Sequence, residues 1–460
     1  MRFAPLLPGT ARRLLVNISV LSSCILFNSA SQAELSLQQA QQLALQNDPW
    51  LVGNKLQEQA IIANSVASST FADPMVSLGF ANLPTDGFRF NQEPMTQFKI
   101  GVSQQFPRGD SLALQKEQLV QMAAQYPQLR YERQAKLKVM VSKLWFDAFT
   151  TEQRIQLVEH SRPLFSQLVD IVEASYSTVQ GSTTQQDVVR AQVELARLDD
   201  RLAALLAERD TSLAELSQWL QDELEPNLVP TAHSGRTLPQ SWPIQAMLDS
   251  SVINLLQQQD LRSLSQILAQ HPALMAIEQQ IKSSQSAVNL AEQKYQPQWG
   301  VNASYAYRDN DPLGNTRADF FSIGVTVDVP FFTANKQDKE VEASRLQAES
   351  IKTDKQLLLR QLLAQMLSTW RTLDSLNQRI EHYLQKILPQ MAEQSEAALN
   401  AYTSDEGDFS EVMRARIAQL NTELDVIKLQ NEQAKSRIQL DYFFTTKNNQ
   451  APLNAMGERP

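Results

Sequence analysis

The chain has 460 residues, a formal net charge of −9 at pH 7 and only 13 glycines. The length allows two or three domains, and the scarcity of glycine favours long helices. The acidic balance argues against a nucleic-acid-binding protein, because such a protein presents a basic face to the phosphates.

The N-terminus has the pattern of a secretory signal. Two arginines precede an apolar run from Leu14 to Phe27, and small residues follow to Ala33. We therefore expect residues 1–33 to be cleaved off. The residues around Cys24 also resemble a lipoprotein cleavage box, so lipidation of Cys24 is the alternative. No later run reaches the roughly 18 apolar residues that a membrane helix needs.

Short motifs recur at a constant offset of 223 residues. The triplet Asn47-Asp48-Pro49 corresponds to Gln270-His271-Pro272, and Ile100-Gly101-Val102 corresponds to Ile323-Gly324-Val325. This recurrence predicts two tandem repeats, each with a helix, a β-hairpin and a long helical hairpin. The expected parts are a signal at 1–33, a first repeat at 34–224, a linker at 225–261, a second repeat at 262–446 and a disordered tail at 447–460.

The same elements are predicted in each repeat, in chain order. The first repeat is expected to hold a helix over about 36–69, a β-hairpin within 75–106, a helical stretch over 111–178, a tip near 176–187 and a helix over 184–224. The second is expected to hold a helix over about 262–293, a β-hairpin within 298–329, a helix over 337–401, a tip near 402–411 and a helix over 409–441.

Prolines mark two kinds of position in this scheme. Pro107 and Pro330 follow the second strand of each hairpin, where we expect the chain to turn into its long helix. Pro127 and Pro163 fall inside the first long helical stretch and predict irregularities there.

The helices carry heptad spacing. Val188, Leu195 and Leu202 lie seven residues apart, and the apolar residues from Met413 to Ile427 alternate steps of four and three. Such spacing indicates knobs-into-holes packing along a coiled seam. By itself this pattern fits an ordinary soluble coiled coil as well.

The strands alternate apolar and small or polar residues. Phe321, Ile323 and Val325 alternate with Ser322 and Gly324. This alternation is typical of a membrane barrel, although a half-buried sheet in a soluble domain gives the same pattern. Four such strands in an exported chain with no membrane helix favour the barrel. Four strands cannot close a barrel, so the chain must oligomerise if they span a membrane.

The segment "ADPMVSLGFANLP" at 72–84, followed by "PMTQFKIGVSQQFPRGD" at 94–110, resembles the TolC-like outer-membrane efflux protein family. The similarity is to its heavy-metal branch, which serves cation or copper/silver efflux. It implies a mainly α fold with a small β part, in which a homotrimer joins a twelve-stranded barrel in outer-membrane lipid to a periplasmic α-barrel. It also implies passive conduction, powered by an inner-membrane proton-driven RND pump through a periplasmic adaptor (membrane fusion) protein.

The resemblance also assigns roles at the two helical tips, where "DVVRA" at 187–191 pairs with "EVMRA" at 411–415. Carboxylates around one axis would attract cations and form a gate, although an acidic turn is also simply solvated surface or helix-capping chemistry. The candidates for the gate are Asp405, Glu406, Asp408 and Glu411. The tip-locking candidates are Tyr402 and Arg414, with Tyr176, Asp187 and Arg190 in the first repeat. The turn glycines are Gly181 and Gly407, expected at positive φ.

The sequence shows no signature of catalysis. The histidines have no ligand spacing, and there is no nucleophile motif or nucleotide loop. We therefore predict no enzyme activity, cofactor or metal site. The alternatives are a multidrug or type I secretion channel of the same fold, and a non-conducting periplasmic adaptor or scaffold.

Overall fold

The computed structural model describes residues 34–177, 183–220, 238–239, 241–243, 250–404 and 406–446. The predicted signal with Cys24, the tip residues Gly181 and Asp405, most of the predicted linker and the 447–460 tail lie outside the described residues.

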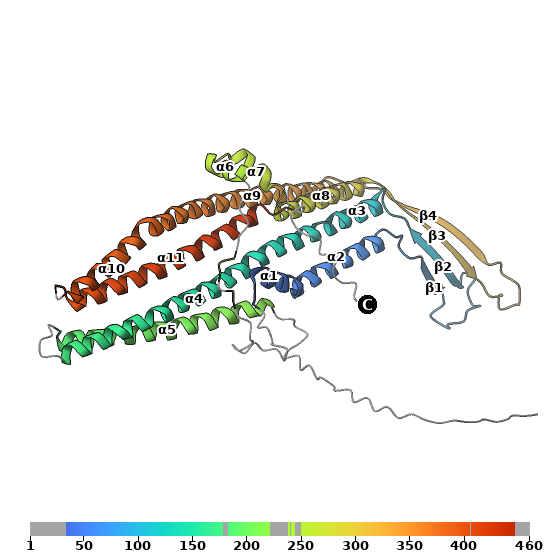
Figure 1. The fold of residues 1–460 in the computed structure, drawn as a ribbon. Coiled ribbons are helices and arrows are strands. Elements are labelled where there is room, and N and C mark those ends of the chain that lie inside the picture. The colour runs from blue at the N-terminus through green and yellow to red at the C-terminus, as the bar shows by residue number, and fades with distance from the viewer. Residues whose placement is uncertain are drawn as a thin grey trace, which may run out of the picture.

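The molecule is a long rod of helices with a small sheet at one end (Figure 1). The α-helices described are α1 Leu37–Gln46, α2 Pro49–Ala67, α3 Ser111–Ala123, α4 Gln125–Ser177, α5 Gln185–Leu220, α6 Ser250–Gln258, α7 Leu261–Leu268, α8 Pro272–Glu292, α9 Gln337–His382, α10 Leu388–Thr403 and α11 Phe409–Phe443. Helix α4 alone has 53 residues, about 80 Å at 1.5 Å per residue. The predicted fold class, mainly helical with a small β part, is confirmed.

The four strands form one antiparallel sheet in the order β1-β2-β3-β4. Their bounds are β1 Met75–Ala81, β2 Gln97–Gln105, β3 Gln298–Tyr307 and β4 Phe320–Asp328. The two predicted hairpins join through β2 and β3, where Val102 lies opposite Ala303. Strands β1 and β4 are therefore the two edges of the sheet.

The alternation in the strands gives the sheet two different faces. One face carries apolar side chains exposed to the surroundings: Val76, Leu78, Phe80, Ile100, Val102, Val301, Tyr305, Phe321, Ile323, Val325 and Val327. The register places Leu78, Ile100 and Tyr305 in one row across three strands. The other face is small and polar. An added Cβ on Gly101 would lie 2.6 Å from Ser77 Oγ, so this position has no room for a side chain.

Two helices predicted as continuous are broken, and at equivalent residues. The expected helix over 36–69 is interrupted at Asp48, and the one over 262–293 at His271. Each residue precedes a proline, which disfavours helical backbone before it. Each instead caps the next helix: Asp48 Oδ1 accepts from Trp50 N at 3.2 Å and His271 Nδ1 accepts from Ala273 N at 3.3 Å. The prediction of single helices there was wrong.

The long helices depart from regularity elsewhere. The stretch over 111–178 divides at Ala124, whereas α4 runs on through Pro163. Between α9 and α10 lies a five-residue π-helix, Tyr383–Ile387, just before Pro389. A π-helical turn accommodates the proline, because proline has no backbone N–H to donate to the helical hydrogen bonds. This irregularity was not predicted.

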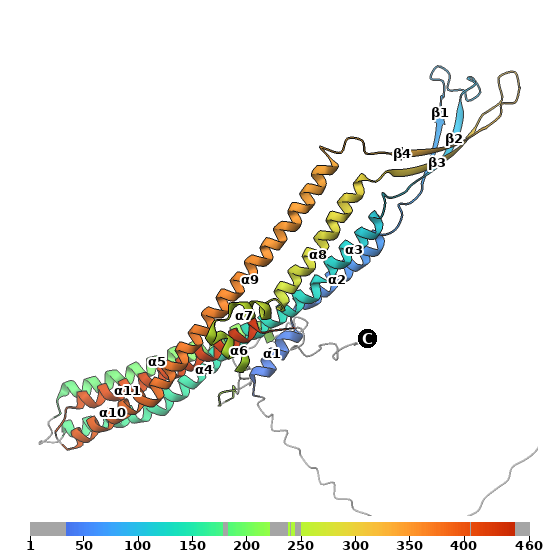
Figure 2. The same ribbon diagram turned by 90° about the horizontal axis from the view of Figure 1, so that it is seen from above.

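The apolar seams predicted from heptad spacing pack the rod together. Toward the tips, α4, α5, α10 and α11 share one buried cluster. Leu198 and Leu205 of α5 and Leu420 and Leu424 of α11 are buried in it. At mid-rod an aromatic cluster surrounds Trp145, whose indole N–H donates to the carbonyl oxygen of Leu35 at 2.9 Å. These contacts hold the tips at one end and the sheet at the other (Figure 2).

Candidate functional site

The tips of the two helical hairpins lie at the end of the rod away from the sheet (Figure 1). Tyr402, predicted as a tip-locking residue, has its hydroxyl 3.4 Å from Thr183 Oγ1 of the other hairpin. Thr183 Oγ1 is also 2.7 Å from Ser175 Oγ. The Tyr402 ring packs edge-on against buried Phe409, with centroids 5.6 Å apart. The two tips of one chain are therefore connected by a polar contact. Sequence reasoning missed Thr183 and Ser175, since only their nearness to the predicted turn marked them.

Arg414 makes its contacts on its own helix. Its guanidinium lies 3.1 Å from Glu411 Oε1 and donates to Ser410 Oγ at 3.3 Å. A contact from Arg414 to another helix stays a prediction for assembled copies.

The equivalent residues of the first tip behave differently. Asp187 Oδ2 accepts from the backbone N of Thr184 at 3.1 Å and from its hydroxyl at 2.7 Å, so Asp187 fixes the start of α5. Arg190 is exposed, and the described residues contain no ion pair between it and Asp187. Tyr176 is also exposed. Among the described tip residues, the arginine–carboxylate pair is found in the second repeat.

The three described candidates for the gate, Glu406, Asp408 and Glu411, are all exposed at the free end of the rod. Asp408 occupies the N-cap position of α11 in extended conformation, yet its side chain makes no capping hydrogen bond. Capping, the alternative explanation for an acid at this position, is therefore not what its carboxylate does. The role of these three residues in a gate stays a prediction.

Gly407 is required for space rather than for a left-handed backbone. Among the described glycines only Gly109 and Gly314 have positive φ, so the expectation of positive φ at Gly407 was wrong. A Cβ on Gly407 would lie 2.9 Å from the Ala401 Cβ and 3.2 Å from the backbone N of Tyr402. The chain closes tightly on the end of α10 at this turn, and a side chain would force it open.

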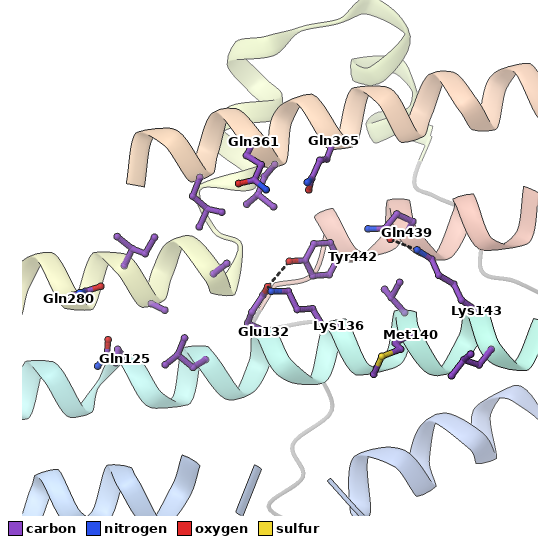
Figure 3. Close-up of a pocket in the computed structure, with 18 residues that line it drawn as sticks. Gln125, Glu132, Lys136, Met140, Lys143, Gln280, Gln361, Gln365, Gln439 and Tyr442 are labelled. Atoms are coloured by element: carbon purple, nitrogen blue, oxygen red, sulfur yellow. Dashed lines mark hydrogen bonds and ion pairs between the residues drawn. The ribbon is translucent and has the colours of Figure 1, made fainter. Parts of the chain in front are cut away.

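A cavity of about 830 Å³ lies at mid-rod between α4, α8, α9 and α11 (Figure 3). Tyr442 donates its hydroxyl to Glu132 Oε1 at 2.5 Å, and Lys143 Nζ donates to Gln439 Oε1 at 2.7 Å. Burial lowers the pKa of the Lys143 amine, and the nearby Lys435 lowers it further. These contacts tie α4 to the end of α11.

The two helix caps meet α4 at consecutive residues. Asp48 Oδ2 accepts from Arg133 Nε at 2.8 Å, with the guanidinium near the Trp50 ring. His271 lies on the other side, its Nδ1 3.6 Å from Glu132 Oε2. Because Nδ1 accepts the capping bond, the proton is on Nε2, which donates to the carbonyl oxygen of Tyr442 at 3.1 Å. Burial lowers the pKa of His271, and the Glu132 carboxylate opposes that shift.

Helices able to cross a bilayer are not found: each described helix is too short or too polar.

Comparison with known proteins gives a family match for the second repeat and a fold for nearly the whole chain. Residues 263–443 match the model of a family described as outer membrane efflux protein. The solved structure of CusC is similar with a TM-score of 0.71 and 16% identity, covering 90% of this chain and 92% of CusC. The outer-membrane channel OprN gives 0.70 and 13%, covering 89% of each chain. The Campylobacter jejuni CmeC outer-membrane channel gives 0.69 and 13%, covering 89% of this chain and 85% of that one. Comparison with curated proteins found no match.

At such identities the likeness to solved structures establishes the fold, and it does so for nearly the whole chain. The family match covers residues 263–443, within the second predicted repeat, and agrees with the resemblance seen in the sequence. The chain thus has the fold of the outer-membrane efflux channels.

Proposed function

We propose that this chain is the outer-membrane channel of a tripartite efflux pump, through which substrate passes passively from the periplasm to the exterior. The observation that carries the proposal is the sheet. An exposed apolar face runs across all four strands, and both edges are open. In lipid, unpaired edges cost several kcal/mol for each unsatisfied backbone group. Copies must therefore pair edge to edge, and the resemblance to the family favours three.

The position of the tips indicates how the channel is oriented. They lie at the opposite end of a rod whose longest helix spans about 80 Å, far from the sheet (Figure 2). With the sheet in the membrane, the tips reach into the periplasm. There they meet the periplasmic adaptor, and the inner-membrane RND pump supplies the energy. The carboxylates at Glu406, Asp408 and Glu411 surround the entrance and favour cations.

Heavy-metal cations are the cargo we propose, on the resemblance of residues 72–110 to the heavy-metal branch. The structural likeness does not select a cargo, because the TM-scores for CusC, OprN and CmeC lie between 0.69 and 0.71. Growth of a deletion strain against graded zinc, cadmium, cobalt, copper and silver tests the assignment, with drugs and bile salts alongside. Sensitivity confined to metals supports it. Sensitivity to drugs with normal metal tolerance would instead assign the chain to a multidrug pump.

Fractionation separates the channel from a non-conducting adaptor or scaffold. A channel stays in the outer-membrane fraction after carbonate washing and runs as a heat-labile oligomer in mild detergent. An adaptor without the membrane sheet washes off. A matched variant, Ile323→Asp, places a charge on the apolar face of β4 and should reduce the membrane-bound fraction severely. Ser322→Asp, on the small polar face beside it, should retain insertion far better.

A further inference from the structure

The two repeats turn from strand to helix through equivalent corners, but only one corner is covered. After β2, Arg108 Nη1 donates to the carbonyl oxygen of Gln296 at 2.6 Å, and its guanidinium also pairs with Asp328 of β4. Gln296 lies in the turn between α8 and β3. The corner of the first repeat thus docks on the helix-to-strand turn of the second.

Gly109 brings this first corner close. It has φ +45°, and a Cβ there would lie 2.3 Å from Gln293 Oε1. The same Gln293 oxygen accepts from the backbone N of Asp110 at 3.1 Å. Arginine and glycine are therefore both needed for a polar, closely fitted contact.

The corner of the second repeat has the opposite chemistry. At the offset of 223 residues, Phe331 stands where Arg108 does and Phe332 where Gly109 does. Their side chains are 80% and 95% exposed, so the described part of this chain leaves them uncovered. Helix α9 begins at Gln337, three residues later than the offset predicts from Ser111, so this corner is also longer.

The surface that would receive this corner also exposes an aromatic side chain. The helix-to-strand turn of the first repeat, between α2 and β1, has Thr70 and Asp73 at the positions equivalent to Gln293 and Gln296. Between them, Phe71 stands where the second repeat has Lys294, which pairs with Glu340. Phe71 is 62% exposed and packs edge-on against Phe106, with ring centroids 6.1 Å apart. The open corner of the second repeat and the turn that would receive it therefore both expose aromatic side chains, although the turn keeps polar residues at the two contact positions. Because β4 and β1 are opposite edges of the sheet, only another copy can bring the two halves together.

The β2–β3 register, transferred by the repeat offset to β4 and the neighbouring β1, is compatible with this pairing. Within the chain, Val102 lies opposite Ala303 and Gly101 opposite Ser304. The repeat offset converts these pairs into Val325 opposite Phe80, and Gly324 opposite Ala81, of the neighbouring copy. Apolar residues then meet apolar residues on one face and small residues meet on the other. A slip of one residue would place apolar side chains on the small face.

We propose that Phe331 and Phe332 dock on Phe71 and Phe106 of the neighbouring copy, forming an aromatic joint beside each β4–β1 junction. The inference rests on the proposed function, since it needs copies joined through their sheet edges. A second copy is favoured over lipid because the receiving turn exposes Phe71 next to Thr70, the position equivalent to Gln293. Burial of two phenylalanines at each joint also stabilises the ring.

Cysteine cross-linking of the full chain tests the joint. Cys24 is the only natural cysteine, so each pair is introduced with Cys24→Ser. Phe332→Cys with Phe71→Cys tests the corner, and Val325→Cys with Phe80→Cys tests the edge register. Phe332→Cys with Phe88→Cys, in the distant loop of the first hairpin, is the control. Membranes are treated with diamide or a short bis-maleimide and run on denaturing gels without reductant.

We expect the corner and register pairs to convert most of the chain into linked multimers, and the control pair to stay monomeric. Linked register pairs with no linked corner pairs would overturn the joint and leave the channel standing. Failure of both pairs would overturn the joint and the ring of copies on which the proposed function rests. A nitroxide at Phe332→Cys gives a second measurement. High oxygen and low nickel-chelate accessibility would assign the corner to lipid and contradict the joint.

Discussion

The two repeats break their helices at the same place, yet α4 holds the two breaks with opposite charges. In the first repeat a buried carboxylate, Asp48, meets the Arg133 guanidinium; in the second a buried imidazole, His271, faces the Glu132 carboxylate. Backbone geometry has been kept while the side-chain chemistry has diverged. The repeat therefore specifies where the helices break, and each half stabilises its break independently.

The largest expected effect comes from removing the Arg133–Asp48 ion pair at the first helix break. Arg133→Ala leaves the Asp48 carboxylate, whose side chain is 3% exposed, without its cation. An uncompensated buried charge costs about 3 kcal/mol or more. The midpoint of thermal unfolding in detergent should fall clearly. Lys339→Ala, on α9, is the control and should change it little, because the side chains of Lys339 and its partner Glu342 are 66% and 55% exposed. Equal effects of the two variants would show that the Asp48–Arg133 pair does not stabilise the helix break.

The helix break capped by His271 should lose stability in acid. Burial lowers the pKa of His271 below its unfolded value of about 6.5. The unfolded chain then binds more protons, so this contribution to stability is fully present above that value. It is lost as pH falls from there toward the lower folded pKa.

His271→Asn sharpens this test, because asparagine keeps an N-cap acceptor and does not titrate. We expect its thermal midpoint to fall less than that of the parent between about pH 7.5 and 5. His160→Asn, on the exposed surface of α4, should behave like the parent. A fall as steep in His271→Asn as in the parent would place the acid sensitivity elsewhere.

The tips offer a smaller version of the same comparison. Tyr402→Phe removes the hydroxyl that meets Thr183 and keeps the ring against Phe409. The net loss should be about 1 kcal/mol or less, too little to change folding. The expected readout is more frequent spontaneous opening in single-channel records. Tyr176→Phe, at an exposed residue of the first tip, should leave opening closer to the parent. Identical opening by all three proteins would remove Tyr402 as a lock.

The strand and heptad patterns predicted the fold well because both periods are short and each element buries one face. The helix breaks were missed although both motifs were recognised as repeats. The prolines of Asn47-Asp48-Pro49 and Gln270-His271-Pro272 permitted either a kink or a new helix start. The π-helix before Pro389 has no local pattern of its own.

The candidate site was predictable only in part. Composition showed the acids at the second tip, and the paired motifs located both tips. The contact of Tyr402 with Thr183 depends on how two hairpins pack, which sequence spacing does not encode. The Glu411–Arg414 pair follows from a spacing of three on one helix, but what those residues meet in neighbouring copies depends on assembly.

Recording from the purified protein in planar bilayers tests the central claim most directly. We expect discrete, mostly closed channels that prefer cations. Replacing Asp405, Glu406, Asp408 and Glu411 with Ala should lower the cation preference or loosen closure. Alanine at Glu349 and Glu432, exposed acids on α9 and α11 away from the tip, should do neither. A folded, membrane-inserted oligomer that conducts no ions, even when Tyr402→Phe is introduced, would contradict the account.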